Sequence, residues 1–136
     1  MPKKRAAISI IFILPKINIP TMYQLIILIP LNVNINSFDE GWPDFLEAAE
    51  EMEGLIRESV SRIDRSIYGQ NNIRRIYSFL YRDKSSFEKS LLSPPGEKAG
   101  KIIHEITGGD VILLSGPFQE DSLERIQSWE DLDDDS

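Results

Sequence analysis

The chain has 136 residues, a net charge of −7, one histidine and no cysteine. Its length predicts a single domain, and its composition, 41% apolar and 27% charged, is typical of a folded globular protein. The missing cysteines exclude disulfides and thiolate metal sites, and the single histidine excludes a multi-histidine metal centre. The acidic balance disfavours nucleic-acid binding, which needs basic side chains opposite phosphates. No apolar run approaches the roughly 18–20 residues of a membrane helix, so we expect no membrane partner.

The two ends of the chain differ from its middle. Residues 1–21 begin with the basic Lys3–Arg5 and continue with the apolar Ala6–Leu14, the order found in a secretory signal, but no small-residue cleavage site follows. We therefore expect residues 1–21 to be an N-terminal extension of a cytoplasmic protein, with a secretory signal as the alternative. The domain itself is predicted over residues 22–118, followed by an acidic C-terminal tail over residues 119–136.

The first half of the predicted domain contains a strand, a helix and a second strand. Tyr23–Pro30 is apolar at both odd and even positions, which indicates a strand buried on both faces. Ser37 stands three residues before Glu40, the spacing of a capping box, and predicts the start of a helix that ends near Gly54. Leu55–Ile63 is the most polar strand and suits a sheet edge. The apolar stripe of the helix consists of Trp42, Phe45, Leu46, Ala49 and Met52.

The second half repeats this pattern with one strand on each side of a broken helix. Ile73–Tyr81 is an aromatic-rich strand. Ser85, three residues before a glutamate, predicts a helix start, and Ser93 predicts a new start after the prolines interrupt that helix. Gly108 ends the helix, and Val111–Leu114 is the last buried strand, ended by a Gly-Pro pair. The second apolar stripe consists of Ala99, Ile102, Ile103 and Ile106.

The order of these elements is βαββαβ, which predicts an α+β fold of ferredoxin-like topology. In that fold two helices cover one face of a four-stranded antiparallel sheet and leave the other face open. The first, third and fourth strands are apolar at both parities, so the open face also needs a cover. A second copy of the chain, in a two-fold homodimer, is the first interpretation. The isoleucine-rich extension of residues 1–21 is the alternative cover.

Two segments give the chain a resemblance to a known family. The run from Trp42–Phe45 through Ala48–Glu58 resembles the first helix and second strand of the EthD family, in which a Met-Pro-Gly-Leu-like turn precedes a basic–acidic pair. The chain has Glu53 where that turn usually has proline. Ser93–Ala99 is similar to the family's Ser-Pro-(acidic or small)-Gly helix break. The resemblance spans residues 22–118 and neither terminus.

The resemblance implies a dimeric α+β barrel with a small hydrophobic cavity and no cofactor. The family takes its name from an accessory protein in the bacterial oxidation of ethyl tert-butyl ether. The resemblance leaves open whether the chain is an enzyme. If the chain is an enzyme, the resemblance implies a cofactor-independent oxidoreductase or isomerase of the dimeric barrel type. Because fold does not fix function, the alternative is a non-catalytic dimerisation or binding module.

Three side chains of the third strand are the candidate ligand-binding residues: Arg75, Tyr77 and Tyr81. They share one parity with Phe79, so they point to one side of the sheet. Aromatic rings with polar tips at a sheet-lined cavity suit a small, mainly apolar ligand. The alternative is that the rings only fill the core.

The remaining candidates give weaker predictions. His104 falls about 150° from the centre of the second apolar stripe, so we expect it to face solvent rather than to bind haem. The arginines around the second and third strands suit either an anionic group or pairing with Glu58 and Asp64. No catalytic residue and no metal ligand can be named from the sequence.

Overall fold

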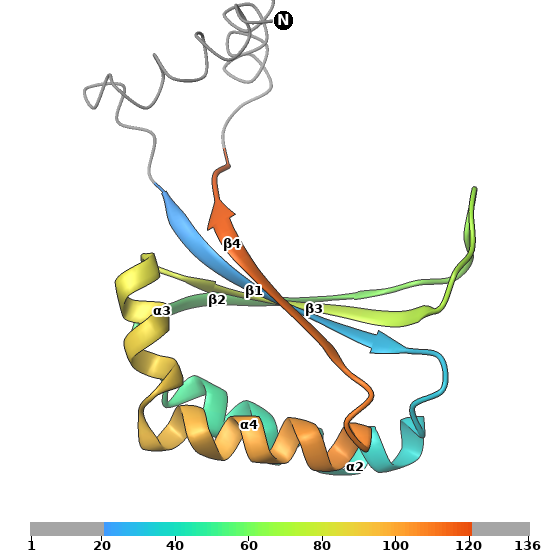
Figure 1. Ribbon diagram of the computed structural model, residues 1–136, viewed down its shortest axis with the longest axis horizontal. Coiled ribbons are helices and arrows are strands. Elements are labelled where there is room, and N and C mark those ends of the chain that lie inside the picture. Colours follow the sequence, from blue (N-terminus) through green and yellow to red (C-terminus); the bar gives the residue numbers. More distant parts are fainter. Residues whose placement is uncertain (1–20, 121–136) are drawn as a thin grey trace, which may run out of the picture. The chain divides into compact units, whose positions relative to one another are not determined.

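The computed structural model describes residues 21–120 (Figure 1). Predictions for residues 1–20 and 121–136 lie outside this range. Thr21–Phe118 form one compact unit, while the boundaries of the predicted domain stay a prediction. The elements are β1 (Met22–Pro30), α2 (Ile35–Glu50), β2 (Leu55–Arg62), β3 (Ile73–Tyr81), α3 (Lys84–Leu91), α4 (Pro94–Thr107) and β4 (Ile112–Phe118).

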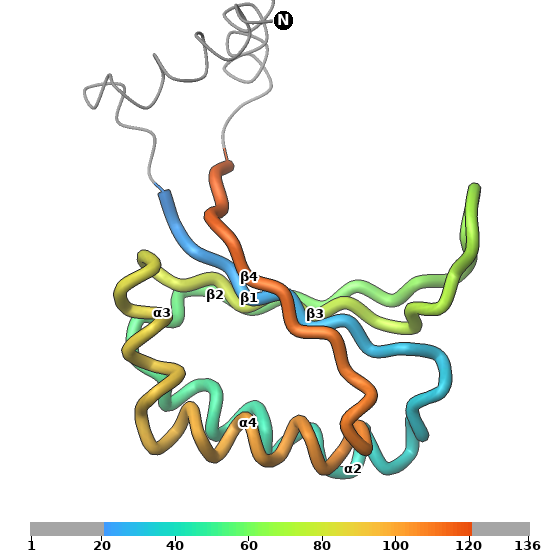
Figure 2. The backbone as a smooth tube through the Cα atoms, viewed as in Figure 1, coloured from blue at the N-terminus to red at the C-terminus, as the bar shows by residue number. Residues whose placement is uncertain are grey.

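The four strands form one antiparallel sheet in the order β2-β3-β1-β4. This order confirms the ferredoxin-like prediction and places the polar β2 at an edge. The three helices lie on one side of the sheet, with α2 and α4 side by side along it and α3 linking β3 to α4 (Figure 1). The loop between β2 and β3 bends away from the helices (Figure 2). No helix within residues 21–120 has the length and apolarity that crossing a bilayer requires.

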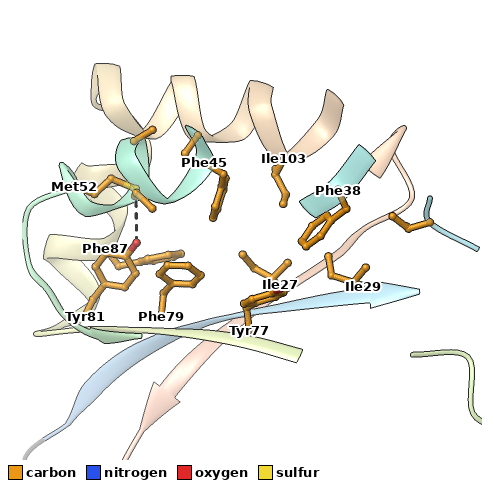
Figure 3. Packing of buried hydrophobic residues seen from close by; sticks show 14 residues of the cluster. Ile27, Ile29, Phe38, Phe45, Met52, Tyr77, Phe79, Tyr81, Phe87 and Ile103 are labelled. Carbon is orange, nitrogen blue, oxygen red and sulfur yellow. Dashed lines mark hydrogen bonds between the residues drawn. The ribbon is translucent and has the colours of Figure 1, made fainter. Parts of the chain in front are cut away.

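The core lies between the sheet and the helices. Odd-numbered side chains of β1 and β3 point to the helices, and they include the fully buried Ile27 and Ile29 and the aromatic row Tyr77, Phe79 and Tyr81. They meet buried side chains of α2 and α4 (Figure 3). Because side chains alternate along a strand, this parity also determines which residues face away from the helices. The helix side of the core is completed by Phe38, Phe45, Ala48, Ala49, Met52, Phe87, Ala99 and Ile103.

The opposite face of the sheet is uncovered by any helix; it carries apolar side chains of β1, β3 and β4 together with polar ones, among them the hydrogen-bonded Gln24 and Ser78. Pairing in register brings Ile26 beside Leu114 and Leu28 beside Ile112 on this face, and Leu28 also pairs with Ile76 of β3. Ile112 and Leu114 are 41% and 49% exposed. The prediction that β4 is buried therefore does not hold within a single chain.

The start of α2 differs from the prediction. The helix begins at Ile35, and its cap is Asn34, whose side-chain oxygen accepts hydrogen bonds from the backbone N–H groups of Asn36 and Ser37 at 3.1 Å. The predicted capping box at Ser37 is wrong because asparagine caps as well as serine does and stands three residues earlier. The helix ends at Glu50, and Gly54, with φ of 87°, forms the turn into β2.

The broken second helix is confirmed, with one change of cap. Asp83 caps α3 instead of the predicted Ser85, accepting from the N–H of Ser86 at 2.7 Å. Ser93 caps α4 as predicted, accepting from the N–H of Gly96 at 3.3 Å. A Cβ at Gly96 would lie 2.1 Å from the carbonyl oxygen of Ser90, so only glycine allows the two helices to meet this closely.

The last strand is longer than predicted. β4 extends through Gly116 and Pro117 to Phe118, and Pro117 pairs with Tyr23 of β1. A proline lacks the N–H that a central strand needs, but β4 is an edge strand, where one N–H can face away from the sheet.

The cap of α2 can be tested by mutation. Asn34→Ala should lower the free energy of unfolding by about 1 kcal/mol, because two N–H groups of the first turn lose their acceptor. Ser37→Ala, at the cap expected from the sequence, should change it by less than about 0.5 kcal/mol. Urea denaturation of both variants measures the difference. An equal loss of unfolding free energy in both variants would contradict the assignment of Asn34 as the only cap.

Candidate ligand-binding cavity

A cavity of about 220 Å³ lies between the sheet and the helices. It is reached by side chains from both central strands and from three helices. Its walls are almost entirely apolar, so it offers space to a molecule that is poorly solvated by water. Its walls include Leu25, Ile27, Phe45, Phe79, Tyr81 and Ile103.

Small residues on the helices leave this space open. Ala49 of α2 and Gly96, Ala99 and Gly100 of α4 all line the cavity. A Cβ at Gly100 would meet no atom within 4 Å, so a side chain at this position has free space. Gly100 of α4 and Leu113 of β4 are exposed, so the cavity reaches the surface beside these residues.

Tyr81 supplies the buried polar group of the cavity. Its hydroxyl donates to the sulfur of Met52 at 3.7 Å (Figure 3), and a thioether is only a weak acceptor. Burial, and secondly the charge of Glu58, raise the pKa of Tyr81 to about 12. The phenol therefore stays protonated at neutral pH and acts as a hydrogen-bond donor, not as a base. The other hydroxyl in the lining is that of Ser115.

Tyr77 and Arg75 share the face of Tyr81 but do not line its cavity. Arg75 forms an ion pair with Asp39 of α2, with nitrogen and oxygen 2.7 Å apart, and donates to the Tyr77 hydroxyl at 3.1 Å. This hydrogen bond from Arg75 lowers the pKa of Asp39. Tyr77 lines a separate groove beside Trp42. Of the three candidate residues, only Tyr81 lines the cavity of about 220 Å³, and a ligand-binding role for all three stays a prediction.

For several residues near the site, the structure can be compared with the predictions made from the sequence. Trp42, expected in the buried stripe of α2, is half-buried. It borders a groove lined by residues of β2 and β3, and because β2 is the edge strand, the sheet does not continue beyond it. The lining residues Gly96 and Gly100 were not predicted as site residues, although glycines inside a helical stripe are a usable signal for a close approach or a gap. His104 is exposed, as predicted. Within residues 21–120, no cluster of three or more histidine or acidic side chains is placed to hold a metal.

Solved structures with the same fold include proteins of different kinds. An EthD family protein from Bacillus halodurans superposes with a TM-score of 0.63 at 24% identity, covering 74% of this chain and 99% of that chain. The chain has the fold of an EthD protein. This agrees with the resemblance carried by the segments around Trp42 and Ser93.

Two further structures show the range of this fold. A hydroxynitrile lyase from Passiflora edulis has a TM-score of 0.59 at 12% identity, covering 76% of this chain and 98% of that one. A dimeric ferredoxin-like protein of unknown function from Jannaschia has a TM-score of 0.54 at 14% identity, with coverages of 71% and 97%. No protein-family model and no curated protein matches the chain. At these identities the likeness shows the fold and leaves the reaction open.

The buried state of Tyr81 predicts how stability depends on pH. Because its folded pKa is raised above the unfolded value near 10, the unfolded chain ionises first, and stability is lost as pH rises from about 10 to about 12. Tyr81→Phe should lose less stability across this window than the wild type, measured by urea denaturation at each pH. Tyr68→Phe, at a side chain that is 97% exposed, is the control for removing one phenol. Identical slopes in wild type and Tyr81→Phe would contradict the buried, protonated phenol.

Proposed function

We propose that the domain binds one small, mainly apolar molecule in the cavity between its sheet and helices. The observation that carries this proposal is an apolar space of about 220 Å³ with one buried hydroxyl at its wall. For comparison of size, an enclosed cavity of about 150 Å³ lined by aliphatic and aromatic side chains admits benzene. A molecule of one aromatic ring or a short branched ether fits this size.

The hydroxyl of Tyr81 would orient such a molecule. Its present acceptor is the sulfur of Met52, so an ether or carbonyl oxygen in the cavity would offer the phenol a better acceptor. The lining has no charged side chain among the described residues. This composition favours binding, in an accessory role, over acid–base chemistry in the cavity. The oxidoreductase and isomerase activities implied by the EthD resemblance, and membership of that family, stay proposals.

We further propose that the chain acts as a homodimer through the open face of the sheet. The apolar side chains of Ile26, Ile76 and Leu114 on this face support it, since strands with one face in water usually carry polar side chains on that face. The Jannaschia protein of the same fold is dimeric. Two open sheet faces packed on each other would leave the helix-side cavity of each copy outside the interface.

A second function is favoured by one observation. The cavity is lined mostly by residues of the hydrophobic core, and few polar groups converge on it. Such a space also fits a non-catalytic dimerisation module that has no ligand at all. Ligand binding separates the two functions.

The test uses two ligands of nearly the same shape, anisole and ethylbenzene, followed by ligand-observed NMR. Anisole has an ether oxygen where ethylbenzene has a methylene, so only anisole can accept a hydrogen bond from Tyr81. The wild type should bind both. Tyr81→Phe should weaken anisole binding several-fold, as expected for a hydrogen bond of about 0.5–1.5 kcal/mol, and leave ethylbenzene binding unchanged.

A filling variant and its control locate the binding. Gly100→Leu places a side chain at the open end of the cavity and should abolish binding of both ligands. Lys101→Leu adds an apolar group at the neighbouring exposed position and should bind as the wild type does. If neither ligand binds the wild type, the dimerisation module is the better account.

A further inference from the structure

A polar hollow of about 340 Å³ lies between the turn that follows α2 and the helix α3. Four charged side chains line it, and we define the polar hollow by them: Glu51, Glu53, Arg82 and Lys89. It shares no lining residue with the apolar cavity of about 220 Å³. The proposed function therefore makes no use of this space.

Tertiary contacts hold the backbone around the polar hollow in place. The buried hydroxyl of Ser90 donates to the carbonyl oxygen of Glu53 at 2.6 Å. The backbone N–H of Arg82 donates to the carbonyl oxygen of Gly54 at 2.8 Å. A Cβ at Gly54 would lie 2.7 Å from the Cβ of Ser86, so α3 passes close to this turn. The turn and α3 therefore form a fixed frame for the charged side chains.

The charges of the polar hollow are separated by element. Both acids, Glu51 and Glu53, belong to the turn between α2 and β2, whereas Arg82 directly follows β3 and Lys89 lies on α3. Within residues 21–120, the side chains of Glu51, Glu53 and Lys89 form no ion pair. One side of the hollow is therefore acidic and the other basic, and the two sides do not neutralise each other through direct contact.

The hydroxyl groups of the hollow are already used within the chain. The Ser93 hydroxyl donates to the carbonyl oxygen of Ser90 at 2.6 Å and also caps α4. The hydroxyl of Ser86 accepts from the guanidinium of Arg82 at 3.1 Å, and this guanidinium lies 3.7 Å from the carboxylate of Asp83. A guanidinium has five N–H donors, so Arg82 keeps donors for a ligand. The charged groups, rather than the hydroxyls, are what the hollow offers to a ligand.

We propose that the polar hollow binds a small zwitterion that carries a primary ammonium group and a carboxylate. Its ammonium group lies near the carboxylates of Glu51 and Glu53, and its carboxylate accepts hydrogen bonds from Arg82 and Lys89. A ligand with only one charge is attracted by one side of the hollow and repelled by the other. A volume of about 340 Å³ exceeds the roughly 150 Å³ that admits benzene, so it has room for an amino acid with a chain of six carbons.

The exposure of the four side chains determines how such a ligand must bind. Glu51, Glu53, Arg82 and Lys89 are all exposed, and contacts between exposed charges are individually weak. Binding therefore depends on both sides of the hollow being engaged at once. Removal of either ligand charge, or of a charge on either side, should weaken it.

The test compares 6-aminohexanoate with hexylamine and hexanoate, which each lack one of its two charges. The full chain is titrated with each compound, and the backbone N–H signals of residues 51–54 and 86–90 are followed by NMR. 6-Aminohexanoate should shift these signals and bind at least about three-fold more tightly than either of the other two, because only it contacts both sides.

Two variants, each removing one charge, have opposite expected patterns. Lys89→Met should weaken 6-aminohexanoate and hexanoate at least about three-fold and leave hexylamine no weaker. Glu53→Gln should weaken 6-aminohexanoate and hexylamine to a similar degree and leave hexanoate no weaker. The matched controls are Lys98→Met and Glu47→Gln, at exposed positions outside the hollow, and both should bind as the wild type does. A thermal melt of each variant checks that it is folded.

Four results would overturn the proposal. They are no shift of these signals by 6-aminohexanoate, equal affinities for the three compounds, wild-type affinity for 6-aminohexanoate in either Lys89→Met or Glu53→Gln, and an equal loss in the matched controls. The last result would assign the binding to the net charge of the chain. Gly100→Leu, which fills the apolar cavity, should leave 6-aminohexanoate binding intact, so failure of this proposal and failure of the proposed function are separately visible.

Discussion

The packing of alternate side chains of β1 and β3 against α2 and α4 determines the rest of this structure. Ile27, Ile29, Tyr77, Phe79 and Tyr81 all point to the helices and are buried there. Since side chains alternate at every residue, a slip of one position in either strand would send this row to the opposite face. The same parity determines which residues line the cavity, which line the groove beside Trp42, and which remain on the open face.

This arrangement places two chemically different spaces on either side of Phe79. Toward Tyr81 the lining is neutral and apolar, with a phenol that burial keeps protonated. Toward Tyr77 the lining combines aromatic rings with the carboxyl of Glu58, whose pKa is raised first by burial and then by the neighbouring Glu50. Desolvation acts in both places, but among the described residues one lining has no charged group and the other has an acid beside a second acid, so the two spaces differ in chemistry.

Periodicity in the sequence predicted the order of elements, the edge position of β2, the exposure of His104 and the second helix start at Ser93. These follow from local patterns along one strand or one helix turn. The caps at Asn34 and Asp83 were missed because each has a competing serine within three residues, and local spacing does not choose between them. The continuation of β4 through Pro117 depends on that strand lying at an edge, which only the assembled sheet shows.

The candidate site was less predictable for the same reason. Parity placed Arg75, Tyr77 and Tyr81 on one face, and the structure has them there. Their separation into different surroundings depends on contacts between distant parts of the chain. Asp39 draws Arg75 toward α2 from 36 residues away, and the space beside Tyr81 depends on how the small residues of α4 meet the sheet. Neither contact leaves a pattern in the local sequence.

We propose that a second copy of the chain covers the apolar side chains that β1, β3 and β4 present on the open face of the sheet. Light scattering at micromolar concentration measures this most directly. The account predicts about twice the 15.5 kDa mass of the chain for the wild type. Ile112→Glu, which puts a charge on the open face without lining the cavity, should give a folded monomer, and Lys98→Glu, at an exposed position of α4, should stay dimeric. A wild type with the mass of one chain would contradict the account.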